Sequence, residues 1–162
     1  MRSRSRHSSA RGTGHMQLTR FTDLGLRVLM YLAVRRGEAT TTVQQVGNFF
    51  QVSHNHLTKV VHRLAQVGWI STVQGRGGGI SLALPEAQIR IGDVIASLEP
   101  TLEVIDCGAP PCPLAGCCRL KDVLGAAERS FLATLNEYTL SDLARGRTAK
   151  VIRMMPRIKR GG

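Results

Sequence analysis

The stretch TVQQVGNFFQVSHNHLTKVVHRLAQVG (residues 42–68) decides the fold of this chain. Its apolar residues recur three and four positions apart, which is the spacing of helices with one buried face. The pattern predicts a first helix over 42–50 that is capped by a threonine, a tight turn, and a second helix over 54–67. Ser53 is placed to cap this second helix, and Gly68 ends it. Two short helices joined by so tight a turn are typical of a helix–turn–helix.

The second of these helices has two faces of different chemistry. Its buried stripe is predicted to consist of Leu57, Val60, Val61 and Leu64. The opposite face carries polar and basic residues and no acidic residue. Such a face suits the phosphate backbone of a nucleic acid. The alternative is a small helical bundle whose polar face is simply solvated.

The segments on either side complete a recognisable arrangement. The predicted elements are, in chain order, a helix at 18–36, the helix–turn–helix, a hairpin with strands at 69–73 and 80–84 around a glycine-rich tip, and a helix at 91–98. A helix, a helix–turn–helix and a hairpin in that order make a winged helix. The predicted fold class is therefore mainly α, with a β-hairpin wing, and the winged-helix domain is expected to span residues 16–100.

A helix–turn–helix places its second helix in the major groove of DNA, with its N-terminal residues at base edges. Asn55 is the predicted direct contact, because an asparagine side chain pairs bidentately with adenine. Arg76 is flanked by glycines in the hairpin tip and is predicted to enter a minor groove. The predicted partner is double-stranded operator DNA. The residues predicted to contact it are Ser53, His54, Asn55, His56, Thr58, Lys59, His62, Arg63 and Arg76.

The formal net charge of +11 is distributed unevenly along the chain. Residues 16–82 carry an excess of five positive charges, whereas residues 83–144 carry an excess of five negative charges. The segments 1–15 and 145–162 are basic and hold no acidic residue, and both are predicted to be disordered. A basic helix–turn–helix module is expected of a DNA-binding protein. Neither a secretory signal nor a membrane-spanning segment is visible, which predicts a cytoplasmic protein with no membrane partner.

All four cysteines lie within the segment CGAPPCPLAGCC (107–118). Its prolines and glycines disfavour helix and strand, so residues 101–118 are predicted to form a loop. Gathered thiols indicate disulfides, zinc, an iron–sulfur cluster or a redox pair. Stable disulfides are rare in the cytoplasm, where clustered cysteines more often bind metal or perform redox chemistry. The spacing of the cysteines does not by itself separate zinc from an iron–sulfur cluster.

A long amphipathic helix is predicted to follow the cysteines, over residues 119–138. Such a helix after the globular module has little left in its own chain to pack against. We therefore expect residues 119–144 to form a dimerisation helix, and the protein to be a homodimer. The apolar stripe of this helix is predicted to be Leu120, Leu124, Ala127, Phe131, Leu135 and Tyr138.

The chain resembles a specific family over roughly residues 16–144. The matching segments are MQLTRFTDLGLRVLMYLA (16–33), VSHNHLTKVVHRL (52–64), GRGGGISL (75–82), IRIGDVIASLEP (89–100) and CRLKDVL (118–124). They are similar to the winged-helix iron–sulfur regulators, a family that includes the nitric-oxide-sensing repressor NsrR and the cluster-biogenesis regulator IscR. The IscR-like members use a histidine a few residues after the last cysteine. No histidine follows here, so the chain resembles the NsrR branch more closely.

This resemblance implies a set of metal ligands. Three cysteines in the loop before the dimerisation helix would hold one iron–sulfur cluster per subunit, of the 4Fe–4S or 2Fe–2S type. The matching residues are Cys107, Cys112 and Cys118. Cys117 is an additional thiol that departs from the family pattern, and it is the alternative third ligand because it would space the cysteines evenly. A fourth ligand implied by the NsrR branch is Asp23, donated by the partner subunit.

The resemblance further implies a transcriptional repressor with nitric oxide as its signal. The dimer would release its operator when the cluster is nitrosylated, and genes that protect against nitrosative stress would then be expressed. The alternative is a winged-helix regulator that uses an iron–sulfur cluster, zinc or bare thiols to sense another signal, such as cluster status or redox state. No catalytic residue is predicted. A thiol oxidoreductase is disfavoured because the loop contains no C-x-x-C pair.

Overall fold

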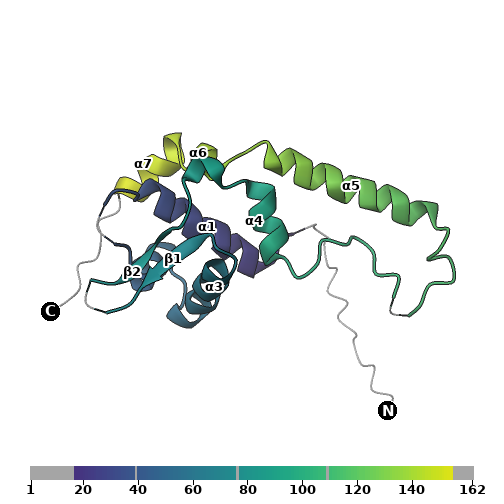
Figure 1. Ribbon diagram of the computed structural model, residues 1–162, viewed down its shortest axis with the longest axis horizontal. Helices are drawn as coiled ribbons and strands as arrows, with labels where there is room; N and C mark the ends of the chain where they lie inside the picture. Colours follow the sequence, from purple (N-terminus) through teal and green to yellow (C-terminus); the bar gives the residue numbers. More distant parts are fainter. Residues whose placement is uncertain (1–16, 39, 76, 109, 155–162) are drawn as a thin grey trace, which may run out of the picture.

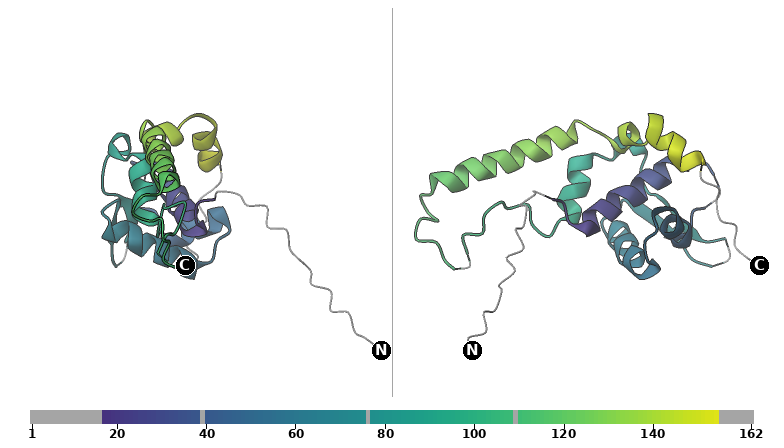
Figure 2. Two further views of the ribbon diagram at one scale, coloured as in Figure 1. Left: turned by 90° about the vertical axis from the view of Figure 1, so that its right-hand side faces the viewer. Right: turned by 180° about the vertical axis from the view of Figure 1, so that it is seen from behind.

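The computed structural model describes residues 17–38, 40–75, 77–108 and 110–154 of the 162-residue chain. A body of helices with a small hairpin carries one long helix that extends away from it (Figures 1 and 2). The elements, in order, are α1 (Arg20–Val34), α2 (Val43–Phe50), α3 (His54–Gln66), β1 (Ile70–Val73), β2 (Gly79–Leu82), the 3-10 helix η1 (Glu86–Gln88), α4 (Ile91–Leu98), α5 (Arg119–Asn136), α6 (Leu140–Leu143) and α7 (Gly146–Met154). The predicted mainly α fold with a β-hairpin is confirmed.

The helix–turn–helix forms where the sequence predicts it. Thr42 caps α2 through a capping box, in which its hydroxyl accepts from the amide of Gln45 and the Gln45 side chain accepts from the amide of Thr42. Gln51 ends α2 in the left-handed conformation, with a φ of 53°. The predicted cap of α3 is wrong in its detail. Ser53 stands at the N-cap position, but its side chain makes no capping hydrogen bond within the described structure.

The core lies between α1, α3 and α4 and is mainly aliphatic. The predicted stripe of α3 is confirmed, because Leu57, Val60, Val61 and Leu64 are all buried. α2 contributes Val46, which is fully buried. The other large, fully buried apolar side chains are Leu29, Val28, Ile89, Ile95, Val94 and Leu140. Within the described segments no helix is both long enough and apolar enough to cross a membrane.

The hairpin is antiparallel and packs against the segment that precedes α2. Its register pairs Ile70 with Leu82 and Val73 with Gly79. The amide of Ile80 donates to the carbonyl of Thr41 at 2.7 Å, which attaches β2 to the body. A Cβ atom on Gly79 would lie 2.3 Å from the Thr41 carbonyl oxygen. The glycine at this position therefore permits the close approach of two backbones.

The chain leaves the body after α4 and returns through α5. Residues 101–118, which we call the cysteine loop, run from the end of α4 out to the end of α5 that is farther from the body (Figure 1). α5 begins at Arg119 as predicted and ends at Asn136, two residues before the predicted end. A Cβ on Gly92 of α4 would lie 2.7 Å from the carbonyl oxygen of Leu132, so the glycine lets α4 and α5 pack closely.

The predicted disordered tail from residue 145 is wrong for its first part. α7 covers Gly146–Met154 and packs on α1, on the side opposite α3 (Figures 1 and 2). Its Ala149 and Ile152 are buried, and the Arg35 guanidinium donates to the Ile152 carbonyl at 2.8 Å. A cation at the C-terminal carbonyls of a helix stabilises it. The predictions for residues 1–15 and 155–162 lie outside the described residues.

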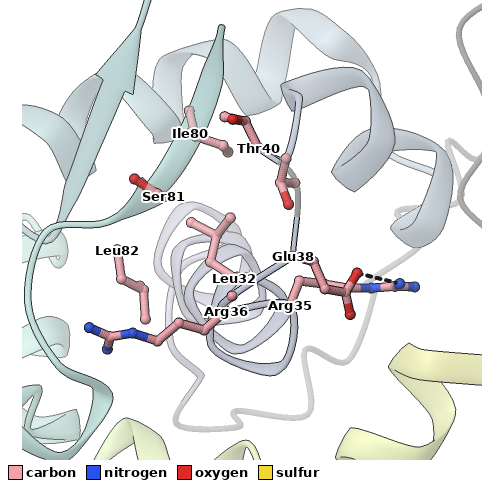
Figure 3. Close-up of a pocket in the computed structure, with 10 residues that line it drawn as sticks. Leu32, Arg35, Arg36, Glu38, Thr40, Ile80, Ser81 and Leu82 are labelled. Carbon is pink, nitrogen blue, oxygen red and sulfur yellow. Dashed lines mark hydrogen bonds and ion pairs between the residues drawn. The ribbon is translucent and has the colours of Figure 1, made fainter. Parts of the chain in front are cut away.

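Arg35 also borders a cavity of about 160 Å³ between the end of α1 and β2. Its guanidinium is paired with Glu38 at 3.1 Å (Figure 3). Arg36, on the other side of the cavity, forms an ion pair with Glu86. The backbone amide of Glu86 itself, and then Arg36, lower the pKa of this carboxyl below its ordinary value. The charges around the cavity are thus already paired with residues of the same chain.

Candidate nucleic-acid interface and cysteine loop

The polar face of α3 is open to solvent along its whole length. Every predicted DNA-contacting residue that the structure describes is exposed, namely Ser53, His54, Asn55, His56, Thr58, Lys59, His62 and Arg63. The first turn of α3 contains no acidic residue. Three basic or titratable side chains, Lys59, His62 and Arg63, follow along the helix. The face is therefore accessible to a polyanion and carries no charge that would repel it.

The first turn of α3 presents side chains in two different states. The Thr58 hydroxyl donates to the carbonyl of His54 at 2.9 Å and lies 3.3 Å from Nδ1 of the same histidine. These two residues are thus partly engaged with each other. Asn55 and His56 are exposed beside them. In a helix–turn–helix this end of the second helix faces the base edges, so Asn55 is well placed for direct contact.

Arg63 also makes a contact within its own chain. Its Nη2 donates to the backbone carbonyl of Ser97, at the end of α4, at 3.0 Å. The side chain is therefore turned toward α4, and the predicted contact of Arg63 with DNA stays a prediction. Arg76, the predicted minor-groove residue, lies outside the described residues. Its neighbours Gly75 and Gly77 both have positive φ, at 93° and 83°.

The cysteine loop contains four free thiols. Cys107, Cys112 and Cys118 are half-buried, whereas Cys117 is exposed. Backbone turns shape the loop, because the amide of Cys112 donates to the carbonyl of Cys107 at 3.0 Å and the amide of Cys117 donates to that of Leu114 at 2.9 Å. Soft thiolate donors of this kind suit an iron–sulfur cluster or zinc. The donor set thus fits such a group by its chemistry.

Within the described part of the chain, these donors do not come together at one point. No three His, Cys, Asp or Glu side chains among the described residues lie close enough together to hold a metal ion. Asp23, the predicted fourth ligand, is half-buried in the first turn of α1, with 46% of its side chain exposed. Both of its carboxylate oxygens lie 2.9 Å from Nε of Arg27. An exposed ion pair of this type is weak, so Asp23 remains available to another partner.

Two sets of contacts were not foreseen in the sequence. Ser97 of α4 accepts hydrogen bonds from both Arg63 and Trp69. Asn136, at the end of α5, exchanges hydrogen bonds with Asp93 of α4. These contacts join residues 28 to 43 positions apart, and no local periodicity indicates them. Only Gly92, a glycine in the first turn of α4, could have indicated a close neighbour there.

The comparison with protein families decides the identity of the fold. Residues 18–146 match the family model Rrf2, which is described as an iron-dependent transcriptional regulator. The chain belongs to the Rrf2 family. The match spans the body, the cysteine loop and α5. This Rrf2 chain is accordingly a transcriptional regulator, and the family description agrees with the prediction that it is not an enzyme.

Solved structures resemble this Rrf2 chain over most of its length. The cysteine regulator CymR of B. subtilis matches with a TM-score of 0.66 and 24% identity, over 80% of this chain and 97% of that one. IscR of T. potens matches with a TM-score of 0.64 and 23% identity, over 79% of this chain and 85% of that one. The oxidised form of CymR from Staphylococcus aureus matches with a TM-score of 0.64 and 24% identity, over 81% of this chain and 98% of that one. At these identities the likeness concerns the fold.

Proposed function

We propose that this Rrf2 protein is a repressor that binds double-stranded operator DNA through α3. The observation that carries the proposal is the exposed, acid-free polar face of α3. This face supplies Asn55 for base contact and Lys59 for phosphate contact, in the order that a helix–turn–helix requires. The hairpin β1–β2 stands next to it as the wing (Figure 1).

The same proposal makes the protein a homodimer that is joined through α5. None of the residues of α5 is buried, although the helix carries large apolar side chains. Leu120 is 55% exposed and Val123 is 54% exposed, and both lie in the half of α5 that is farther from the body. Only the returning half, with Leu132 and Leu135, packs on the core of its own chain. The apolar outer half is suited to the same helix of a second subunit.

The cysteine loop is the proposed sensor. Cys107, Cys112 and Cys118 would hold an iron–sulfur cluster, and Asp23 of the partner subunit would complete the set. When bound, the cluster would supply iron, to which nitric oxide binds. The role of the residues of this chain is structural. They hold the loop in one arrangement while all the donors are engaged, and the half-buried state of the three thiols suits donors that face inward. Release of the donors frees the loop and lowers the affinity of the dimer for DNA.

One observation favours a second candidate for the signal. Cys117 is exposed, is adjacent to Cys118 and is only the alternative third ligand of the predicted cluster. An exposed thiol next to other thiols is open to oxidation, so the loop could report redox state without a cluster, or hold zinc. In this case the protein would still be a winged-helix repressor.

The experiment that separates the two is a metal analysis of the intact chain. The protein is purified without oxygen, and its visible absorption, iron, sulfide and zinc are measured. The proposal predicts a brown protein with several irons and matching sulfide per chain. A colourless protein that contains zinc or no metal, and that binds DNA equally before and after nitric oxide, would establish the second candidate instead.

A further inference from the structure

The segment formed by the cysteine loop and α5 is attached to α4 at both of its ends. The cysteine loop begins three residues after the end of this helix, which is Leu98. At the other end, the Asn136 side-chain oxygen accepts from the amide of Asp93, and its Nδ2 donates to the Asp93 carboxylate, both at 3.0 Å. The Arg90 guanidinium also donates to the Asn136 carbonyl, at 2.6 Å. A movement of the cysteine loop and α5 relative to the body therefore acts on α4.

The last turn of α4 is bonded to α3 through Ser97. Its backbone carbonyl accepts from Nη2 of Arg63 at 3.0 Å. The carbonyls in the last turn of a helix have no partner within that helix. A cation at this end also interacts favourably with the helix dipole. The electrostatic attraction between the Arg63 guanidinium and the C-terminal end of α4 therefore directs this side chain toward α4 and away from the exposed face of α3.

A second bond reaches the same residue from the far end of α3. The indole Nε1 of Trp69 donates to the Ser97 hydroxyl at 3.0 Å, and this hydroxyl donates to the Val94 carbonyl at 2.8 Å. Trp69 is fixed to α3 in turn, because its amide donates to the Leu64 carbonyl at 2.9 Å. The side chain of Trp69 is half-buried, so this contact is shielded from solvent more than that of Arg63.

Glu99, the residue that follows α4, joins this turn to α1 as well. The Glu99 carboxylate accepts from both the amide and the hydroxyl of Thr19, at 2.7 and 3.1 Å. Thr19 is the cap of α1. The turn at 97–99, which precedes the cysteine loop, thus contacts α3 and the start of α1 at once.

We propose that Arg63 and Trp69 are positioning residues. They fix the orientation of α3 against the last turn of α4 through Ser97, and Arg63 does not contact DNA. This inference rests on the proposed function, because it takes α3 as the recognition helix and the cysteine loop as the sensor. A rearrangement of the loop shifts the turn at 97–99 and, through these two hydrogen bonds, rotates α3 relative to the second subunit.

The first test compares two cations of α3. The full-length Arg63→Met and Lys59→Met variants are titrated with a duplex selected by the wild-type protein from a randomised pool, and with a scrambled duplex of the same composition. Lys59→Met should lower the slope of log Kobs against log salt by about one per subunit and weaken both duplexes alike. Arg63→Met should leave the slope unchanged. It should weaken only the selected duplex, by about fivefold, as the loss of one hydrogen bond would.

The second test removes the indole donor and keeps the ring. Trp69→Phe should reproduce the behaviour of Arg63→Met, with an unchanged salt slope and a selective loss on the selected duplex. A residue that merely stabilised the fold would lower the affinity for both duplexes equally and lower the midpoint of urea unfolding. In the double variant Arg63→Met and Trp69→Phe, the ratio of the affinities for the selected duplex before and after nitric oxide should fall toward one.

The outcomes separate this inference from the function on which it rests. A wild-type protein that does not prefer its selected duplex would remove the proposed function. If the wild-type protein does prefer it, and Arg63→Met lowers the salt slope as Lys59→Met does, then Arg63 contacts a phosphate and only the positioning role is overturned. Equal losses on both duplexes for Trp69→Phe would overturn that role as well.

Discussion

Cys117 and Cys118 are neighbours in the chain, but their surroundings differ. Cys118 is half-buried at the start of α5, where its carbonyl accepts from the Asp122 amide at 3.4 Å. Cys117 is exposed. A ligand that is held close to the first turn of a helix is better fixed than one on an exposed turn. This difference supports Cys118 as the third ligand.

The proposed ligand set predicts a contrast between two single substitutions. Cys112→Ala should lose bound iron and tight operator binding, because it removes one of three soft donors. Cys117→Ala is the matched control in the same loop and should keep both. Iron, sulfide and operator affinity are measured on anaerobic preparations. Full iron content in Cys112→Ala, or loss of iron in Cys117→Ala, would show that the donors are assigned wrongly.

Asn55 should determine which base is preferred at one position of the operator. Asn55→Ala is expected to weaken the selected duplex by about 1–3 kcal/mol and to relax the preference for adenine at that position. Gln66→Ala is the control, because Gln66 is exposed on α3 at the end that does not face base edges. Binding to a set of duplexes with single substitutions measures both effects. An unchanged base preference in Asn55→Ala would exclude this direct contact.

At the scale of elements, most of the fold follows from local patterns. The bounds of α4 and the start of α5 are those that the sequence predicts, because prolines and apolar spacing act locally. α7 was missed because only two of its residues are buried, in a segment otherwise rich in basic side chains. Its docking depends on Arg35, which is 117 positions away from Ile152. The contacts of Ser97 were missed for the same reason, since they join separate elements.

The docking of α7 is therefore predicted to depend on Arg35. Arg35→Met keeps the aliphatic stem but removes the bond to the Ile152 carbonyl and the ion pair with Glu38. The free energy of unfolding should fall by about 1–3 kcal/mol, because these partners lose a buried, charged donor. Amide hydrogen exchange over residues 146–154 should accelerate.

The control for this prediction is the adjacent arginine. Arg36 is 46% exposed and pairs with Glu86 at the surface. Arg36→Met should therefore change the free energy of unfolding by less than about 0.5 kcal/mol. If Arg35→Met and Arg36→Met are indistinguishable in urea unfolding and in exchange, then α7 is held by its apolar contacts alone.

At the scale of the whole molecule, α5 carries its apolar outer half beyond the body (Figure 2). The double substitution Leu120→Glu and Val123→Glu places two charges on that half and should give a monomer. Operator binding should be lost with the dimer, since two half-sites must be held together. Ala133→Glu, at an exposed position in the half of α5 that returns to the body, is the control and should remain dimeric. Sedimentation velocity measures the oligomeric state of each variant. A double variant that is still dimeric would show that the subunits meet elsewhere.

The link between the cysteine loop and DNA affinity is central to the proposed function. The most direct measurement is an operator-binding titration on one anaerobic preparation of the full chain, with iron and sulfide assayed, before and after the addition of nitric oxide. The account predicts tight, salt-dependent binding by the iron-containing protein and a loss of at least about tenfold after nitric oxide, the equivalent of about 1.4 kcal/mol. Equal affinity before and after nitric oxide, in a protein that contains iron and sulfide, would contradict it.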